Sequence, residues 1–472
     1  MNVQRLKMIV LIIALAVGGA LILTPKSAAH DDDNDHGASV LDRQLSAVLA
    51  QQAFTGRVGS TLERRLGRKI DAILADLGNS AFHDSLLGLA NDNSCAGCHA
   101  APTGFGDTQS IAIGVSNNNI VGPGRMGPRN QRRAPMVLNN VFFRALMWNS
   151  RFNSVSGDPF DNRAGFQFPF PEGFSLSGSS HLLVAQAFIP VTENPEMAGF
   201  AASLPPTHDG IRDEVVARLN ATPEYRKLFG KIFPAVKNGG SITYEMLAEA
   251  IAEFEFTLVF ADAPIDKFAR GQRNAMTDDQ KRGALLFFGS ANCVSCHAVS
   301  GQSNEMFSDF QQHVAGIPQI KPSVTNVTYD GPGANEDFGL EQVTGNAADR
   351  YAFRTSPLRN LALQPAFFHN GAFTRLEDAV RFHLNAVGSA PGYSPTQAGL
   401  DTDLRGPRGP RGPVLARIDP LLANPVNLSN AEFRWLVDFL RVGLQDPKAN
   451  AQDLRKIIPK KLPSGRPVAN FQ

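Results

Sequence analysis

Two Cys-x-x-Cys-His motifs constrain this chain of 472 residues more than any other feature, because together they use every cysteine it has. They read Cys95-Ala-Gly-Cys98-His99 and Cys293-Val-Ser-Cys296-His297. The pattern is typical of c-type haem attachment, in which the two thiols bind the porphyrin covalently and the histidine binds the iron. We therefore predict two haem c groups, with His99 and His297 as proximal ligands.

Two other uses of paired cysteines fit less well. The pairs of a zinc ribbon usually lie about 15–20 residues apart, whereas these two pairs lie about 200 residues apart. A thioredoxin-like redox pair needs a strand–helix–strand context, and nothing strand-like precedes either motif. A histidine directly after both pairs also favours haem.

The N-terminus has the form of an export signal. Arg5 and Lys7 precede an apolar run over residues 8–23, and Ser27-Ala28-Ala29 is a small-residue cleavage site. We predict that residues 1–29 are removed and that the protein is periplasmic, because covalent haem attachment takes place outside the cytoplasm. An uncleaved membrane anchor is the alternative, although the run is shorter than the roughly 20 residues that a spanning helix needs.

Composition sets only broad limits. The formal net charge of +1 gives no support for nucleic-acid binding, and the length allows two domains. The fold class that we predict is mainly α, with two cytochrome c-type haem domains and long irregular loops. The domains would cover residues 38–262 and 263–460, with the boundary near residues 262–264.

Helices are predicted where apolar residues recur at spacings of three and four. Asp278 and Asp279 suit the first turn of one of them, and Ser429 is an N-cap for the last. Residues 104–133, 149–180 and 302–351 are expected to form long loops, which are often functional. The predicted helices cover residues 41–49, 62–77, 134–146, 244–260, 277–288, 376–384 and 431–442.

Several segments resemble the bacterial di-haem cytochrome c peroxidases and their MauG relatives. The resemblance is collinear from about residue 66 to residue 440, which makes it far more specific than one motif. Beyond the first haem motif it rests on Gly104-Phe-Gly-Asp107, Gly127-Pro-Arg-Asn130, Leu138-Asn-Asn140, Trp148-Asn-Ser-Arg151, Gln186-Ala187, Pro190, Glu196-Met197, Phe353–Asn360 and Phe368-His-Asn-Gly371.

The resemblance implies that peroxide binds at the His99 haem. Many family members block this iron with a distal histidine until they are reduced, but this chain has no histidine between His99 and His181. We therefore predict that the first haem is five-coordinate or water-bound as made, and active without reductive activation. Met126, in the corresponding loop over residues 114–126, is the alternative as a removable ligand.

The second haem needs another axial ligand if it is to transfer electrons without reacting with peroxide. The family uses a methionine in the classical peroxidases and a tyrosine in MauG, whereas the matching helix position here is His383. We predict His297/His383 coordination, which lowers the reduction potential relative to a His/Met haem. An ordinary helix-end histidine is the alternative, and His369 is more consistent with a supporting or structural role.

Three further residues receive roles from the resemblance. Glu196 and Gln186 would form the distal pocket of the first haem, since a positioned carboxylate can move a proton between the two peroxide oxygens. Trp148 would carry electrons between the haems. The alternatives are a surface acid for Glu196 and a core tryptophan for Trp148; Phe160-Asp-Asn-Arg163 also competes for the tryptophan motif but lacks the indole.

Family members also bind calcium between their domains. Asn130 is the candidate side chain, with backbone carbonyls near Gln364 and Ala366, although the surrounding residues depart from the family pattern. The arginines at positions 125, 129, 132 and 133 would pair with haem propionates or form a solvated basic loop. The repeat of Arg405, Arg408 and Arg411 would steer an acidic redox partner or form a mobile surface loop.

The function implied is reduction of hydrogen peroxide to water, with electrons from a small cytochrome c or a cupredoxin. One alternative is a MauG-like enzyme that uses peroxide to oxidise a partner protein or another substrate, and the other is a non-enzymatic di-haem electron carrier. The resemblance also allows a homodimer. The long loop over residues 152–181 would cover the first haem, offer a partner surface, or be passive.

Overall fold

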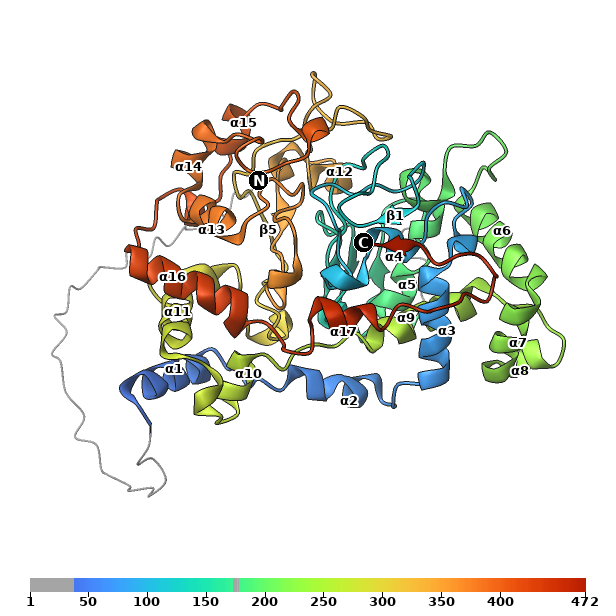
Figure 1. Ribbon diagram of the computed structural model, residues 1–472, viewed down its shortest axis with the longest axis horizontal. Helices are drawn as coiled ribbons and strands as arrows, with labels where there is room; N and C mark the ends of the chain where they lie inside the picture. The colour runs from blue at the N-terminus through green and yellow to red at the C-terminus, as the bar shows by residue number, and fades with distance from the viewer. Residues whose placement is uncertain (1–37, 173–175, 177) are drawn as a thin grey trace, which may run out of the picture. The chain divides into compact units, whose positions relative to one another are not determined.

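Helices dominate the computed structural model, which describes residues 38–172, 176 and 178–472 (Figure 1). The predicted mainly α fold is confirmed, whereas the predicted signal peptide, residues 1–29, lies outside the described residues. The α-helices are α1 (Val40–Gln51), α2 (Leu62–Leu66), α3 (Ala72–His83), α4 (Cys95–Cys98), α5 (Leu182–Gln186), α6 (His208–Ala221), α7 (Pro223–Ile232), α8 (Pro234–Lys237), α9 (Tyr244–Phe256), α10 (Pro264–Ala269), α11 (Asp278–Phe288), α12 (Glu341–Thr344), α13 (Leu376–Leu384), α14 (Ala386–Ser389), α15 (Gly412–Leu415), α16 (Asn430–Asp438) and α17 (Ala451–Arg455).

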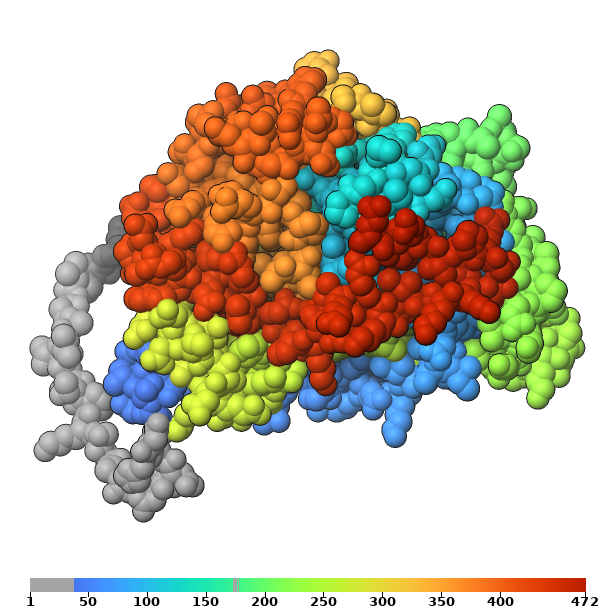
Figure 2. Space-filling view, viewed as in Figure 1, coloured from blue at the N-terminus to red at the C-terminus, as the bar shows by residue number. Residues whose placement is uncertain are grey.

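The strands are short and pair in small sheets. Strands β2, β3 and β4 form an antiparallel sheet in that order, β5 pairs antiparallel with β6, and β1 pairs parallel with β7. Through this last pair the C-terminal segment, red in Figure 2, lies on the surface beside the teal segment near residue 120. The strands are β1 (Ile120–Val121), β2 (Ala145–Leu146), β3 (Phe152–Ser154), β4 (Phe166–Gln167), β5 (Gln312–His313), β6 (Phe353–Arg354) and β7 (Asn470–Phe471).

Side-chain caps begin the principal helices. Ser39 and Thr277 start α1 and α11 with capping boxes, and Ser429 starts α16 in the same way, as predicted for that residue. Asp71 accepts hydrogen bonds from two backbone N–H groups at the start of α3. These caps satisfy backbone donors that have no partner within the helix, so they fix where each helix begins.

Helices α3 and α9 pack tightly and support the first haem-attachment segment. Gly78 of α3 makes this possible, because a Cβ atom there would lie 1.8 Å from the carbonyl oxygen of Ala250 in α9. The apolar residues of both helices join a large buried cluster that also contains Phe105 and Phe142. The helix carrying the first motif, α4, contacts α3 directly.

A second buried cluster supports the other haem-attachment segment. It consists mainly of side chains from α1, α10, α11 and α16, together with Phe307 and Leu376. Each end of the described chain packs in the cluster of the other half. Leu45 near the N-terminus belongs to this second cluster, whereas Leu454 near the C-terminus belongs to the first. Residues 39–472 form one compact unit, so the predicted domain boundary at residues 262–263 stays a prediction.

Several predicted elements need correction. The helix expected over residues 62–77 is two helices, because Gly67 adopts a left-handed conformation that ends α2 and Asp71 starts α3. Residues 134–146 contain a short 3-10 turn and strand β2 in place of a helix. The reason is tertiary: the side chain of Asn139 exchanges two hydrogen bonds with the backbone of Phe260 and turns the chain at positive φ.

Two segments without a clear sequence pattern contain regular elements. Helices α6 and α7 were not predicted, and both lie on the first-haem side of the fold. The segment over residues 152–181, expected to be a loop, includes β3 and β4, and its Phe152, Phe166 and Phe168 are buried in the first cluster. Within the described residues, no helix is long and apolar enough to cross a membrane.

Candidate active site

The two predicted proximal histidines have the same local geometry. His99 Nδ1 lies 3.0 Å from the carbonyl oxygen of Phe105, and His297 Nδ1 lies 3.0 Å from that of Phe307. Because the carbonyl accepts, each Nδ1 carries the proton and each Nε2 keeps its lone pair for a metal. Burial lowers the pKa of both imidazoles, which keeps them neutral and able to bind iron.

His383 faces His297 across a cavity. Their ring centres lie 6.2 Å apart. Two imidazoles that bind one metal ion from opposite sides have ring centres about 6 Å apart, since each metal–nitrogen bond is about 2 Å long. His383 comes from the last turn of α13 and stacks on Phe368, with ring centres 5.3 Å apart. Burial, together with His297, lowers the pKa of His383 to about 4, so it too is neutral.

The cavity between these histidines has a volume of about 420 Å³. Its wall includes both second-motif cysteines and is otherwise largely apolar, with side chains such as Phe287, Phe368 and Leu436. Trp148 also lines it, although that residue belongs to the segment that follows the first motif. The structure therefore brings together His297, His383, Trp148 and the Cys293/Cys296 pair in one enclosed space.

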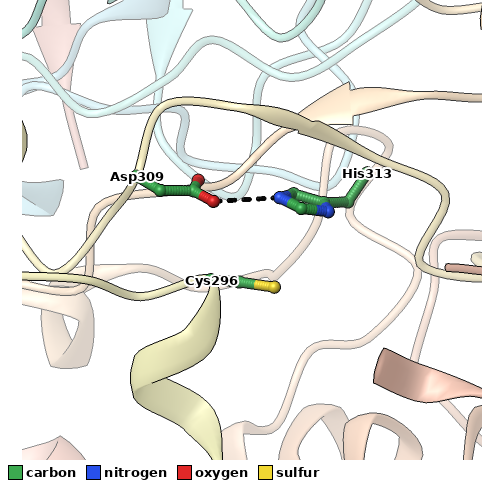
Figure 3. A group of neighbouring side chains, drawn as sticks. All are labelled: Cys296, Asp309 and His313. Carbon is green, nitrogen blue, oxygen red and sulfur yellow. Dashed lines mark hydrogen bonds and ion pairs between the residues drawn. The ribbon is translucent and has the colours of Figure 1, made fainter. Parts of the chain in front are cut away.

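Cys296 lies close to Asp309 and His313 (Figure 3). The possible ligand atoms of the three residues all lie within 4.8 Å of one another, a set that resembles a metal site. Both ring nitrogens of His313 are already engaged, however, at 3.0 Å from Asp309 and 2.7 Å from Asp419. Chiefly through Asp309, these contacts raise the pKa of His313 to about 11, so the imidazolium is itself the cation.

Glu196 lies beside the first haem-attachment segment. Its backbone carbonyl accepts a hydrogen bond of 2.8 Å from Asn93, whose side chain also lies 3.7 Å from the Cys98 sulfur. The side chain is half-buried in a π-helical turn, Asn194–Ala198, and Glu193 next to it pairs with Arg151. Burial, with the nearby Glu193 charge, raises the pKa of Glu196 to about 7, which suits transfer of a proton at neutral pH.

The other residues predicted or considered around the first haem differ in their exposure and in their hydrogen bonds. Gln186 is the half-buried last residue of α5, and its role stays a prediction. Met126 is 67% exposed, so this conformation does not support it as an iron ligand. His181 is used in the fold, because its Nδ1 accepts from Leu183 and its Nε2 donates to the carbonyl of Val141.

Trp148 joins the two haem-attachment regions. Its indole Nε1 donates to the carbonyl oxygen of Arg133 at 2.9 Å, and its own carbonyl accepts from Arg354 at 2.7 Å. The next residue after Arg133, Ala134, donates its N–H to Asp107, which acts electrostatically on His99. The indole is thus fixed between the second cavity and the backbone of the first segment.

The arginines at positions 125, 129, 132 and 133 have different hydrogen-bond and ion-pair partners. Arg129 pairs with Asp401 and Asp403, and Arg132 binds Asp337 through two nitrogens. Arg125 donates to backbone carbonyls and to Asn93. Arg133 is buried and forms no salt bridge among the described residues, although Asp107 acts on it electrostatically. The expectation of a solvated basic loop therefore does not describe this segment.

Sequence reasoning missed a second buried carboxylate near the first haem. Glu255 of α9 accepts a hydrogen bond of 2.8 Å from Asn140 and acts electrostatically on Cys95. Burial raises the pKa of Glu255 to about 7. The available signal was its position: it lies between two phenylalanines on a helix whose other residues are largely apolar.

Comparison with known proteins agrees with this geometry. The family model described as di-haem cytochrome c peroxidase matches residues 73–274. A cytochrome c551 peroxidase of Nitrosomonas europaea is 31% identical over 322 residues, which are 67% of this chain and 75% of the relative. A methylamine utilization protein MauG of Methylorubrum extorquens is 28% identical over 320 residues, which are 67% and 70% of the two chains.

The chain belongs to the di-haem cytochrome c peroxidase and MauG family. It is an oxidoreductase of the cytochrome c peroxidase type. The crystal structure of the diheme peroxidase BthA from Burkholderia thailandensis shares the fold, with a TM-score of 0.54 and 22% identity, covering 81% of this chain and 88% of that one.

The residues of this family member fit two haem c groups. All four motif cysteines are free of disulfides, so each pair is available to form two thioether bonds. Each motif histidine uses Nδ1 for its hydrogen bond and leaves Nε2 for a metal, and His383 supplies a second imidazole to the cavity beside Cys293 and Cys296. The second haem would therefore be held by Cys293, Cys296, His297 and His383, and the first by Cys95, Cys98 and His99.

Proposed function

We propose that this protein is an exported di-haem peroxidase that reduces hydrogen peroxide to water with electrons from a small cytochrome c or a cupredoxin. When bound, the haems supply one iron with an exchangeable position, where peroxide is split, and a second iron that relays single electrons. The observation that carries the proposal is Glu196, a half-buried carboxylate with its pKa raised to about 7 beside the first motif.

Glu196 would move the proton in this reaction. As a carboxylate it takes the proton from one peroxide oxygen and returns it to the other, which leaves as water. Two electrons and two protons in total convert one hydrogen peroxide into two waters. Gln186 would orient the peroxide by a hydrogen bond, and Trp148 would pass electrons from the His297/His383 side, since its indole lines that cavity.

The electron donor would approach the second haem. The segment over residues 414–426 lines its cavity, and the preceding residues carry Arg405, Arg408 and Arg411 without an intervening acid. Arg405 and Arg408 donate to the backbone carbonyls of Leu400 and Tyr393, which supports an ordered basic surface in place of a mobile loop. Such a surface suits an acidic partner.

A MauG-like role is the second candidate. It is favoured by the second imidazole at the second haem, because strong donation helps an iron to hold oxidising equivalents for a protein substrate. The third candidate, a non-enzymatic carrier, is disfavoured by Glu196, because a carrier needs no proton-transferring carboxylate.

A calcium ion is proposed at Asn130. Among the described residues the buried side-chain oxygen of Asn130 has no hydrogen-bond partner, which supports a calcium ion there.

The test is oxidation of a reduced small cytochrome c by hydrogen peroxide, with enzyme that has never been pre-reduced. We expect immediate turnover in the wild type, a large loss in Glu196→Gln, and near wild-type rates in the matched control Glu193→Gln. Peroxide consumption that oxidises an added protein but neither a cytochrome c nor a cupredoxin would favour the MauG-like role. A protein that never reacts with peroxide would be a carrier.

A further inference from the structure

The wall of the second-haem cavity carries two buried guanidinium groups and no carboxylate. Arg133 and Arg354 line it, and each is 4% exposed. No aspartate or glutamate is among the described residues that line the cavity. A buried charge without a salt bridge is costly, so this pair, on a wall without an acid, indicates an anionic occupant.

Neither arginine forms a salt bridge among the described residues, although the buried Asp107 carboxylate acts on Arg133 electrostatically from beyond salt-bridge distance. Arg133 donates to the side-chain oxygen of Gln364 at 3.0 Å and weakly to a backbone carbonyl, and its Nε has no partner among the described residues. Arg354 donates to the carbonyls of Met147 and Thr355. Burial lowers the pKa of each guanidinium to about 10, so both remain cationic at neutral pH.

His369 adds an unused polar group to the same wall. It is buried, its Nε2 has no partner among the described residues, and its ring stacks on Phe353 with centres 3.6 Å apart. Its carbonyl accepts the backbone N–H of Arg133 at 2.9 Å, so the two residues are adjacent. Burial lowers the pKa of His369 to about 3, which leaves a neutral ring with one N–H to donate.

We propose that Arg133 and Arg354 bind the two propionates of the second haem, and that His369 adds a hydrogen bond to one of them. The charges match, since the propionates are the two ionised groups of haem and the cavity wall offers two unpaired guanidiniums. The neighbouring Arg129 and Arg132 are already paired with aspartates and play no part.

This arrangement sets the potential of the second haem. Two imidazole ligands lower the reduction potential relative to a His/Met pair, whereas positive charge beside the propionates raises it. Arg133 is also a positioning residue, because its carbonyl accepts the Trp148 indole N–H. Arg133 would therefore hold the haem through its guanidinium and the indole through its backbone carbonyl.

The first test is the midpoint potential of the second haem, measured by spectroelectrochemistry on the haem-loaded protein without peroxide. We expect Arg354→Gln and Arg133→Gln each to shift the reduction equilibrium about tenfold towards the ferric form, which is about 59 mV for one electron. Arg354→Lys keeps the charge and should retain most of the potential. The matched control Arg129→Gln removes a buried but paired guanidinium and should leave the potential of this haem unchanged.

Wild-type potentials in both glutamine variants, at full haem content, would overturn the proposal. A crystal structure of the wild-type haem-loaded protein decides the matter even if a variant does not fold. It supports the proposal if the guanidinium nitrogens lie within salt-bridge distance of propionate oxygens, and overturns it if the propionates point elsewhere. The inference depends on the haem at His297 and not on peroxide turnover, so failure of the proposed function would be seen separately.

Discussion

The ring centres of His297 and His383 lie 6.2 Å apart across a cavity that also exposes the second cysteine pair. His297 follows the 3-10 turn Cys293–Ser295 and His383 belongs to helix α13, so the two are distant in sequence and meet only in the fold. Among the described residues, the ring contact of His99 is with Phe82 and not with a second histidine, and His181 is engaged in hydrogen bonds with the backbone. The two haem sites therefore differ in the number of imidazoles that they offer.

Replacing His383 should change the second haem specifically. In His383→Met a thioether takes the place of an imidazole, so we expect the midpoint potential of the second haem to rise and its low-spin optical spectrum to gain His/Met character. The first haem serves as the internal control and should keep its potential. A second haem whose potential and spectrum are the same in wild type and His383→Met would show that His383 is not a ligand.

The rate of reaction with peroxide should depend on pH through Glu196. The carboxylate must be ionised to accept a proton, and its pKa is raised to about 7. The second-order rate constant should therefore rise about tenfold between pH 6 and pH 8, and that rise should be absent from a much slower Glu196→Gln. Stopped-flow measurements across this range provide the check. Glu193→Gln should keep a rise with pH but move it to lower pH, because the Glu193 charge helps to raise the pKa of Glu196.

Gly114 should control the position of Glu196. A Cβ atom at Gly114 would lie 1.9 Å from the carbonyl oxygen of Pro195 and 3.1 Å from the Cα of Glu196. We expect Gly114→Ala to displace this turn and to slow peroxide turnover while both haems remain attached. The control is Gly392→Ala, where a Cβ atom would meet nothing within 4 Å. Equal turnover in the two variants would contradict this role for Gly114.

Glu255 should make the protein less stable as the pH rises. Its pKa is raised to about 7 in the folded state, so the folded protein binds more protons than the unfolded chain between about pH 4.5 and pH 7. The free energy of unfolding should fall across this window, by on the order of 3 kcal/mol. Thermal melts at pH 5 and pH 8 should show a smaller drop for Glu255→Gln, and an unchanged drop for Glu245→Gln, an exposed position on the same helix.

Local patterns predicted much of this protein. The haem motifs are contiguous in sequence, and the family resemblance pointed to the helix position of His383, so both could be predicted without coordinates. The predicted cap at Ser429 also depends only on neighbouring residues. The collinear resemblance then assigned the family, which the comparisons confirm.

What the sequence did not reveal depends on distant contacts. The two buried guanidiniums of Arg133 and Arg354 come together only when the cavity wall is assembled, and the His313–Asp419 ion pair joins residues 106 positions apart. The missing helix over residues 134–146 has the same origin, since Asn139 is held by Phe260 from far along the chain. Periodicity carries no information on such contacts.

We infer an open first iron beside Glu196 and a bis-histidine second iron. Low-temperature EPR of the purified, air-oxidised protein, before and after peroxide is added, tests this directly. We predict a high-spin signal beside a low-spin bis-histidine signal, with the high-spin signal lost when peroxide is added. Two low-spin signals that do not respond to peroxide would contradict it, because the first iron would then carry a sixth ligand.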